Sequence, residues 1–358
     1  MIALTPTPIA NRLPEKPDGG ARRYPLEVCQ CPECGHVQLR HYLGDRDHYG
    51  PMYTYRTPDA LMPVLREHAA ALRVRYPNAR SVIEIGCNNG LNLLALMEQA
   101  FEPFGVDPSS SEIDGRIRAK PFERQYCSDL EKVDLIVANN VLAHVESLWE
   151  VFFTIDMLLK TEGHLVFEVQ YLPDMVRSGT FDMIYHEHHD YHTLSPLPKF
   201  LRHFGLVVTD IERLSAHGGS IRVHCSRPGK PVRSLVQLYE DDSEIDWLTF
   251  GAKIERNRWT LNRILEALPE KVVAFGATAK SCTLIHHYGI EKYIECVMDE
   301  TPEKIGKYIP GTGIPILHPK AVKQPKFILL TAWNYAGMIA ARYPKSQLID
   351  PFPMRRAA

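Results

Sequence analysis

The chain has 358 residues, of which 45% are hydrophobic and 23% are charged, as in an ordinary globular protein. This length predicts about two domains whose cores need no disulfide bonds. The composition argues against a disordered chain, a collagen-like fibre and a disulfide-rich miniprotein. The 41 basic and 43 acidic side chains give a net charge of −2, so no global basic field is available to hold a nucleic-acid backbone.

Neither a membrane span nor a secretory leader is expected. The mean hydropathy is −0.21, and the Pro-rich N-terminus lacks a basic region followed by an apolar one. Of the eight cysteines, Cys29, Cys31 and Cys34 cluster, and the others are scattered singly. This pattern predicts reduced thiols in a cytoplasmic protein rather than a disulfide framework.

The N-terminal region is predicted to be irregular. Residues 1–25 contain five prolines and are expected to be extended chain with little regular structure. A CQCPECGH segment and a Tyr-rich stretch follow. Apolar residues at helical spacing then predict a helix over 59–76, which Pro77 ends.

Strands and helices alternate from residue 81 onward, which predicts a parallel sheet covered on both faces. The expected elements are strands over 81–86, 103–107, 134–140 and 164–170, and helices over 88–99 and 148–159. Two later strands, 206–214 and 220–226, would add an antiparallel edge.

A second, smaller α/β unit is predicted to start near Pro228. It would open with a long helix, whose apolar pattern runs over 235–268. The expected elements that follow are strands over 271–276, 293–299 and 327–333, and helices over 277–289 and 336–343.

The strongest local motif is EIGCNNG, residues 84–90, where an apolar strand runs into a glycine loop and then a helix. Ligands of open parallel sheets bind at the carboxyl ends of strands. The motif is neither a G-x-G-x-x-G fingerprint nor a P-loop. Asp107 ends the next strand about 20 residues after Gly86, a separation at which an acid can accept hydrogen bonds from ribose hydroxyls. The alternative is that Asp107 only caps its own turn.

The segments EIGCNNG, GVDPS and DLIVANNVLAHV resemble the class I S-adenosylmethionine-dependent methyltransferases over about residues 75–172. The resemblance implies a doubly wound sheet and S-adenosyl-L-methionine as cofactor. By it, Gly86 and Gly90 face the methionine part, Asp107 binds the ribose, and Asn139 lies beside the methyl group. The expected cofactor-binding residues are Glu84, Gly86, Asn88, Gly90, Asp107 and Asn139.

A dense histidine cluster, FDMIYHEHHDYHTLSP, occupies residues 181–196. Three interpretations compete. A metal site of the H-E-x-x-H type would need a histidine where Asp190 stands. The second interpretation is a structural loop with solvated histidines. The third is a proton-transfer site, because histidine is the natural general base near neutral pH.

Five motifs occur in the order of the bacterial sugar-nucleotide C-methyltransferases, which the chain resembles from about Tyr24 to its C-terminus. They are EVQYL, the YHEHHDYHTLSP run, AHGGSIRV, FGATAKS and LLTAWNY. The resemblance implies an N-terminal module (1–70) with a zinc-knuckle-like part and a Tyr-rich lid, a methyltransferase core (71–227) and a Rossmann-like domain (228–358). It also implies a nucleotide-linked 4-keto deoxysugar as substrate.

The same resemblance assigns roles to single residues. His188 would be the base, assisted by Glu187 and Tyr185, and His144 would orient the sugar or hold the enolate oxygen. A ketone makes this chemistry accessible, because a C–H beside a carbonyl is acidic enough for a histidine base. The expected substrate-binding residues are Tyr53, Tyr55, His186, Lys280, Ser281, Trp333 and Asn334. The alternatives are a helix-start role for His144, aromatic packing for Tyr53 and Tyr55, and a core position for Trp333.

The N-terminal module departs from the family, which uses two C-x-x-C pairs. Here Cys31 and Cys34 form one pair, and Cys29 stands just before it. A structural zinc ion needs four ligands, so His36 or His41 would have to complete the set. We therefore assign no metal and expect a degenerate knuckle, held by packing of Val28, Val37 and Leu39.

Other functions remain open at this stage. The same cofactor site would serve an O- or N-methyltransferase acting on a related nucleotide sugar. More remote alternatives are a nucleic-acid-binding protein that uses the CPEC segment and a cofactor-binding scaffold without catalysis. We expect neither nucleic acid nor membrane as partner. The sequence predicts neither the sugar, the carbon and the nucleoside nor the oligomeric state.

Overall fold

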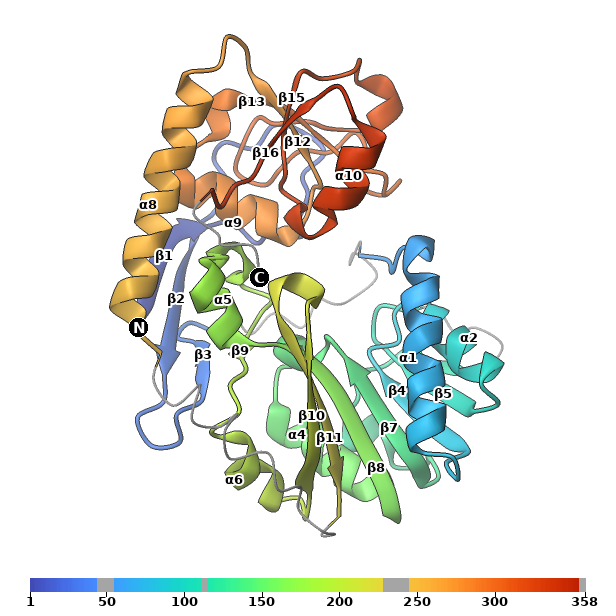
Figure 1. Cartoon of the computed structure of the whole chain (residues 1–358). Helices are drawn as coiled ribbons and strands as arrows, with labels where there is room; N and C mark the ends of the chain where they lie inside the picture. The colour runs from blue at the N-terminus through green and yellow to red at the C-terminus, as the bar shows by residue number, and fades with distance from the viewer. Residues whose placement is uncertain (44–54, 111–114, 228–244, 354–358) are drawn as a thin grey trace.

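The computed structural model describes residues 1–43, 55–110, 115–227 and 245–353. Three sheets organise them (Figure 1): a small N-terminal sheet, a large central sheet and a C-terminal sheet at the far end of the molecule. In this part of the chain, no helix combines the length and apolar character that crossing a bilayer demands.

The central sheet has seven strands in the order β10-β11-β8-β7-β4-β5-β6. All neighbours are parallel except β11, which runs antiparallel to both β8 and β10. The chain winds from β4 outward in both directions, so the predicted doubly wound sheet with an antiparallel edge is confirmed. The strands are β4 (Ser81–Ile85), β5 (Glu102–Val106), β6 (Ile117–Arg118), β7 (Val133–Asn139), β8 (Leu159–Gln170), β10 (Val207–Leu214) and β11 (Ser220–Ser226).

Helices cover both faces of this sheet because its central strands are apolar on both sides. Val82 and Leu135 pack toward α1 (Met62–Arg75) and α2 (Leu91–Glu98). The neighbouring strand residues Ile83 and Ile136 pack instead in the core that contains α4 (Leu148–Leu158). Consecutive strand residues thus serve opposite layers, which is what a sheet buried on both faces requires.

The C-terminal sheet has five parallel strands in the order β14-β13-β12-β15-β16. It confirms the predicted second, smaller α/β unit. The strands are β12 (Val272–Phe275), β13 (Ile294–Met298), β14 (Ile316–Leu317), β15 (Phe327–Leu329) and β16 (Gln347–Ile349), and the helices are α8 (Trp247–Glu266), α9 (Ala279–Tyr288) and α10 (Ala336–Arg342). The strand predicted over 327–333 ends at Leu329, because a 3-10 turn forms at Trp333–Tyr335. Of the long helix predicted over 235–268, residues 235–244 lie outside the described part.

The N-terminal sheet corrects one prediction. Ile2–Thr7 forms a regular strand, β1, which pairs with β2 (Tyr24–Gln30). Proline is tolerated there because β1 lies at the edge of the sheet and its register shifts between Leu4 and Thr7, where Pro6 sits. The side chains of Val28, Val37 and Leu39 are buried, as expected for a knuckle held by packing.

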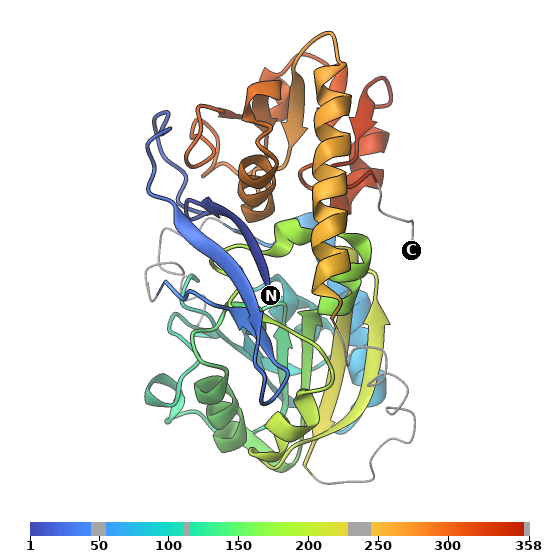
Figure 2. The same cartoon turned by 90° about the vertical axis from the view of Figure 1, so that its left-hand side faces the viewer.

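The histidine segment joins the N-terminal sheet to the rest of the molecule. β3 (Val37–Leu39) pairs with β9 (Asp190–Tyr191), which belongs to the histidine segment. The apolar side chains of the N-terminal sheet share one core with the C-terminal sheet and with Met183 and Ile184 of the same segment. Figure 2 shows the N-terminal strands beside α8, which runs from the C-terminal sheet toward α5 (Leu172–Ser178). The segment that carries the histidines is therefore fixed by the N-terminal sheet and by the core of the C-terminal sheet.

Candidate active site

A cavity of about 1950 Å³ lies at the carboxyl ends of strands in both parallel sheets. From the central sheet it is lined by Gly86, Asp107 and Asn139, which follow or end β4, β5 and β7. From the C-terminal sheet it is lined by Gly276 and Asp299, which follow β12 and β13. One cavity therefore offers two of the strand-end sites at which open α/β sheets bind ligands.

The first glycine of the EIGCNNG loop is required by the chain itself. Gly86 has a φ of +72°, and a Cβ built on it would lie 2.6 Å from Cγ2 of Val141. The absence of a Cβ at Gly86 therefore first allows the side chain of Val141 to pack closely against this loop. Gly90 lies outside the cavity wall, at the N-cap of α2.

Asp107 is buried and rigidly held. Its Oδ2 accepts a hydrogen bond from the backbone N–H of Asn88 at 2.9 Å, and its Oδ1 accepts bonds from the N–H and hydroxyl of Ser109 at 2.7 and 2.6 Å. The capping role named as the alternative is thus present. It fixes a carboxylate at the cavity wall, and no ion pair involves that carboxylate within the described residues.

Two buried oxygens beside this edge have no hydrogen-bond partner among the described residues. They are Oδ1 of Asn139 and Oε2 of Glu84. Burial raises the pKa of Glu84 to about 8, although Nδ2 of Asn92 donates to its Oε1. Unpartnered buried acceptors are costly unless a ligand satisfies them. They fit S-adenosylmethionine, whose ammonium, ribose and adenine groups all carry donors.

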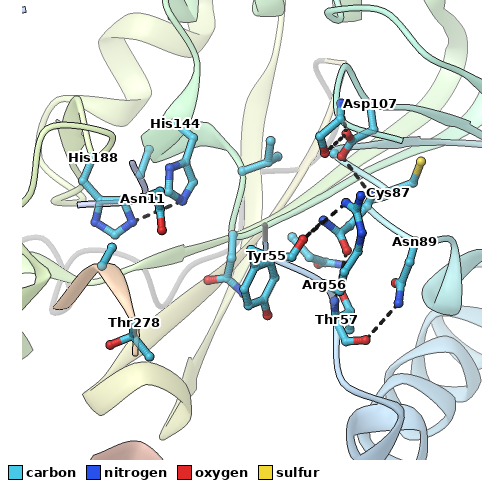
Figure 3. A pocket seen from close by; sticks show the side chains of 18 of the residues that line it. Asn11, Tyr55, Arg56, Thr57, Cys87, Asn89, Asp107, His144, His188 and Thr278 are labelled. Atoms are coloured by element: carbon cyan, nitrogen blue, oxygen red, sulfur yellow. Dashed lines mark hydrogen bonds between the residues drawn. The ribbon is translucent and has the colours of Figure 1, made fainter. Parts of the chain in front are cut away.

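The side chain of Asn88 has a function that the sequence did not indicate. Its Oδ1 accepts from the N–H of Thr57 and its Nδ2 donates to the carbonyl of Tyr55, both at 3.0 Å. Nδ2 of Asn89 also donates to the carbonyl of Thr57, at 2.9 Å (Figure 3). The two asparagines thus hold residues 55–57 across the cavity, where Tyr55 contributes to the wall. The other predicted tyrosine, Tyr53, lies outside the described residues.

Two imidazoles meet at the opposite side of the cavity. Nε2 of His188 lies 3.2 Å from Nε2 of His144 and 2.5 Å from the hydroxyl of Tyr185. Nδ1 of His188 lies 2.9 Å from the carbonyl of Met183, and Nδ1 of His144 lies 2.8 Å from the carbonyl of Glu187. Carbonyls only accept, so both Nδ1 atoms carry hydrogen and both Nε2 atoms are the basic ones. The pair is therefore built to take up a proton between its two Nε2 atoms.

Two neighbours of His188 lie elsewhere than predicted. The Glu187 carboxylate turns toward the N-terminal segment, where its Oε1 accepts from the backbone N–H and Nδ2 of Asn11. Glu187 thus assists the imidazole pair through its carbonyl and not, as expected, through its carboxyl group. His186 is buried outside the cavity wall, with Nε2 3.2 Å from the carbonyl of Pro25 and its ring against Tyr24.

Of the predicted substrate residues in the C-terminal unit, two line the cavity and two are buried outside its wall. Lys280 and Asn334 line the cavity and are joined by a 2.8 Å hydrogen bond from Nζ to Oδ1. Ser281 is fully buried, and its hydroxyl donates to the carbonyl of Thr278. The Trp333 indole is 3% exposed and donates to Asp182 at 2.7 Å. For Trp333 the alternative of a core position is the correct one.

Two cavity residues of this unit, Asp299 and Lys304, were not predicted from the sequence. Asp299 follows β13 as Asp107 follows β5, and its Oδ2 accepts from the backbone N–H of Ala277 at 2.8 Å. Nζ of Lys304 lies 3.6 Å from the same oxygen and donates to the carbonyl of Ala277 at 2.9 Å. The motif YIECVMD, an apolar strand ending in Asp, was the available signal.

The described residues do not fit a structural zinc site. They contain no group of three or more potential ligands arranged around a metal position. The two histidines considered as ligands already face carboxylates: Nε2 of His36 lies 2.7 Å from Asp190, and Nε2 of His41 lies 3.5 Å from Glu27.

Comparisons with known proteins agree with this organisation. Family models match in three consecutive pieces: a putative zinc binding domain over residues 1–49, a methyltransferase domain over 54–211 and a C-methyltransferase C-terminal domain over 215–348. The chain is also 28% identical to the C-methyltransferase NovU of Streptomyces niveus over 372 residues, covering 95% of this chain and 88% of the relative.

Solved structures match the core at low similarity. An O-methyltransferase family protein from Burkholderia thailandensis is 16% identical with a TM-score of 0.38, over 48% of this chain and 59% of that chain. An S-adenosylmethionine-dependent methyltransferase from Clostridium acetobutylicum is 14% identical with a TM-score of 0.38, over 47% of this chain and 92% of that one. Both similarities are too low to indicate an activity. On its matches to the three consecutive domains and to NovU, the chain is an S-adenosylmethionine-dependent methyltransferase that is similar to C-methyltransferases.

Proposed function

We propose that the protein methylates a carbon beside the ketone of a nucleotide-linked 4-keto deoxysugar, with His188 as the base that forms the enolate. The observation that carries this proposal is the imidazole pair. Both Nδ1 atoms of His144 and His188 are tied to backbone carbonyls, which turns both basic Nε2 atoms to one point at the cavity wall. A site built to accept a proton suits a C–H donor.

The proton transfer follows from this geometry. Nε2 of His188 takes the proton from the carbon beside the ketone, and the C–H electron pair moves to form the enolate. The imidazolium that results donates from Nδ1 to Met183 and is stabilised by that carbonyl. Nε2 of His144 lies within hydrogen-bond distance and can share the proton. In the resting pair the Tyr185 hydroxyl donates to Nε2 of His188. Once Nε2 carries the proton taken from carbon, the hydroxyl is released to donate to the enolate oxygen, where a preorganised donor stabilises the developing charge.

Bound S-adenosylmethionine supplies the electrophilic methyl group. Asp107 and the unpartnered oxygens of Glu84 and Asn139 are the groups that would hold it. The imidazole pair and this edge line the same cavity, so one cavity can serve both deprotonation and methyl donation.

The nucleotide end of the substrate is assigned to the C-terminal unit. The cavity continues over Lys280, Asn334 and Lys304 at the strand ends of the second parallel sheet. A lysine ammonium at the start of α9 suits a diphosphate, because the helix N-terminus and the cation both favour negative charge. Lys280 and His188 line the same cavity, so a nucleotide sugar bound along it would place its phosphates at the lysine and its keto sugar at His188.

The proposal is tested by following the methyl group. The protein is incubated with trideuteromethyl-labelled S-adenosylmethionine and a nucleoside diphosphate 4-keto-6-deoxyhexose, and the label is located by NMR. We expect it on the carbon beside the ketone. Label on oxygen or nitrogen would convert the assignment to an O- or N-methyltransferase, and its absence from every ketosugar tried would reject the substrate class.

A variant ties the result to the base. His188→Asn should lower kcat by about 10²- to 10⁴-fold, the usual contribution of a general base, while S-adenosylhomocysteine binds as before. The matched control is His203→Asn, at an exposed histidine that follows α6 (Leu197–Arg202) and does not line the cavity. This control should keep full activity.

A further inference from the structure

Asn11 reaches the active site from the N-terminal segment that follows β1. It is half-buried, lines the cavity and lies beside His144 and His188 (Figure 3). In the same view Asp107 and Cys87 of the donor edge lie on the far side of Tyr55. Asn11 therefore belongs to the side of the cavity where the acceptor sugar is deprotonated.

The orientation of the Asn11 amide is fixed by a buried carboxyl group. Oε1 of Glu187, a residue that is 1% exposed, lies 3.0 Å from Nδ2 and 3.1 Å from the backbone N of Asn11. Because Nδ2 and the backbone N–H are donors that both point to the same oxygen, the amide cannot flip without facing two oxygens toward each other. Its Oδ1 consequently points away from Glu187, and no described residue donates to it.

We propose that Asn11 is a specificity-determining residue, whose amide oxygen accepts a hydrogen bond from an O–H or N–H group on the sugar beside the carbon that is methylated. This inference rests on the proposed function and deepens it, because it states which substituent the sugar must carry. The amide oxygen of Asn11 is a neutral acceptor that carries no proton, so it favours a hydroxyl or amino substituent over a deoxygenated position.

A purely structural role makes a different prediction. Asn11 also helps to hold Glu187, whose carbonyl bonds to Nδ1 of His144. If that support were its whole contribution, its loss would slow all substrates by the same factor. A specificity role instead changes the ratio of two substrates that differ in one substituent, and this ratio is the decisive quantity.

The experiment compares two probes: a nucleoside diphosphate 4-keto-6-deoxyhexose with a hydroxyl group beside the methylated carbon, and its analogue deoxygenated at that position. For the wild-type protein we expect kcat/KM to favour the hydroxylated probe by about tenfold, the size of one net hydrogen bond. In Asn11→Ala this preference should fall close to one, mostly through KM, while S-adenosylhomocysteine binding stays unchanged.

The controls distinguish failure of the Asn11 inference from failure of the proposed function. Asn262→Ala removes an amide of α8 that bonds to the carbonyls of Arg258 and Tyr288 and does not line the cavity. It should leave the ratio at the wild-type value. An undiminished preference in Asn11→Ala, with active protein, overturns the role of Asn11 and leaves the proposed function intact. Failure of the wild-type protein to methylate either probe overturns the proposed function itself.

Discussion

The carboxyl ends of the two parallel sheets use the same backbone arrangement. In each, a glycine with positive φ follows the first strand, Gly86 after β4 and Gly276 after β12. In each, an aspartate follows or ends the adjacent strand of the sheet. Its Oδ2 accepts from a backbone N–H of the glycine loop, and its Oδ1 accepts from the N–H two residues further on.

The two ends differ in the charge around that aspartate. Asp299 has the ammonium of Lys304 at 3.6 Å, whereas Asp107 takes part in no ion pair within the described residues. An unpaired carboxylate is suited to the neutral hydroxyls of a ribose, while a carboxylate neutralised by lysine leaves room for an anion. Under the proposed assignments, a single nearby cation adapts one local fold to two ligands.

Substitution of the glycine that both strand ends share should have the largest effect on stability, and it tests whether the two ends have the same backbone arrangement. Gly86→Ala would place a Cβ 2.6 Å from Cγ2 of Val141, and Gly276→Ala would place one 2.5 Å from Cβ of Ala332. Positive φ and overpacking together should lower the free energy of unfolding by about 2–4 kcal/mol in both variants. Urea unfolding measures it. Gly337→Ala, with nothing within 4 Å of the added Cβ, is the control that should be tolerated.

The matched substitutions Asp107→Asn and Asp299→Asn test the difference. Asp107→Asn should weaken S-adenosylhomocysteine about 100-fold, because charge-assisted hydrogen bonds to two hydroxyls are lost. Asp299→Asn should leave this dissociation constant unchanged. Isothermal titration calorimetry measures both. Equal weakening by the two variants would mean that the two ends are not specialised.

Lys304→Met sharpens the charge argument with a smaller effect. Removal of the ammonium leaves Asp299 negative beside the proposed phosphates, so a nucleoside diphosphate should bind about tenfold more weakly. The effect should decline as salt concentration rises, since salt screens such interactions. Binding at several ionic strengths checks this. The comparison fails if binding of the nucleoside diphosphate is unchanged.

Glu84 provides a test of a different kind, in the pH dependence of stability. Its folded pKa of about 8 lies above the ordinary value of 4.5, so the native state binds more protons between these pH values and stability falls as pH rises through them. Glu84→Gln keeps the acceptor for Asn92 and removes the titration. Relative to the wild type, this variant should gain stability from pH 5.5 to pH 8 in thermal unfolding. A constant difference would contradict the raised pKa.

The two parallel sheets could be predicted from sequence because their signal is local. Apolar runs such as 134–138 and the Gly-to-Asp spacing of the donor loop are visible without tertiary information. Strand β1 could not be predicted, since its pairing partner β2 lies some 20 residues away and the tolerance of Pro6 depends on its position at a sheet edge.

The site was predictable in part for a related reason. His144, Tyr185 and His188 stand in two sequence motifs, VLAHV and the histidine run, and they do meet in the cavity. The sequence cannot show where a side chain turns, so Glu187 and Trp333 were placed in the cavity although both are buried against other parts of the chain. The contact between Asn11 and Glu187 could not be predicted, because it forms only when the strand β1 places the following segment beside the histidine run.

The central claim is that His188 removes a proton from the carbon beside the ketone. It is tested most directly by incubating the protein in D₂O with a nucleoside diphosphate 4-keto-6-deoxyhexose and S-adenosylhomocysteine, which blocks methyl transfer. The account predicts that the wild-type protein exchanges deuterium into that carbon, detected by NMR, and that His188→Asn does not. Equal exchange in both proteins, or none in a wild-type protein that still methylates the sugar, would contradict it.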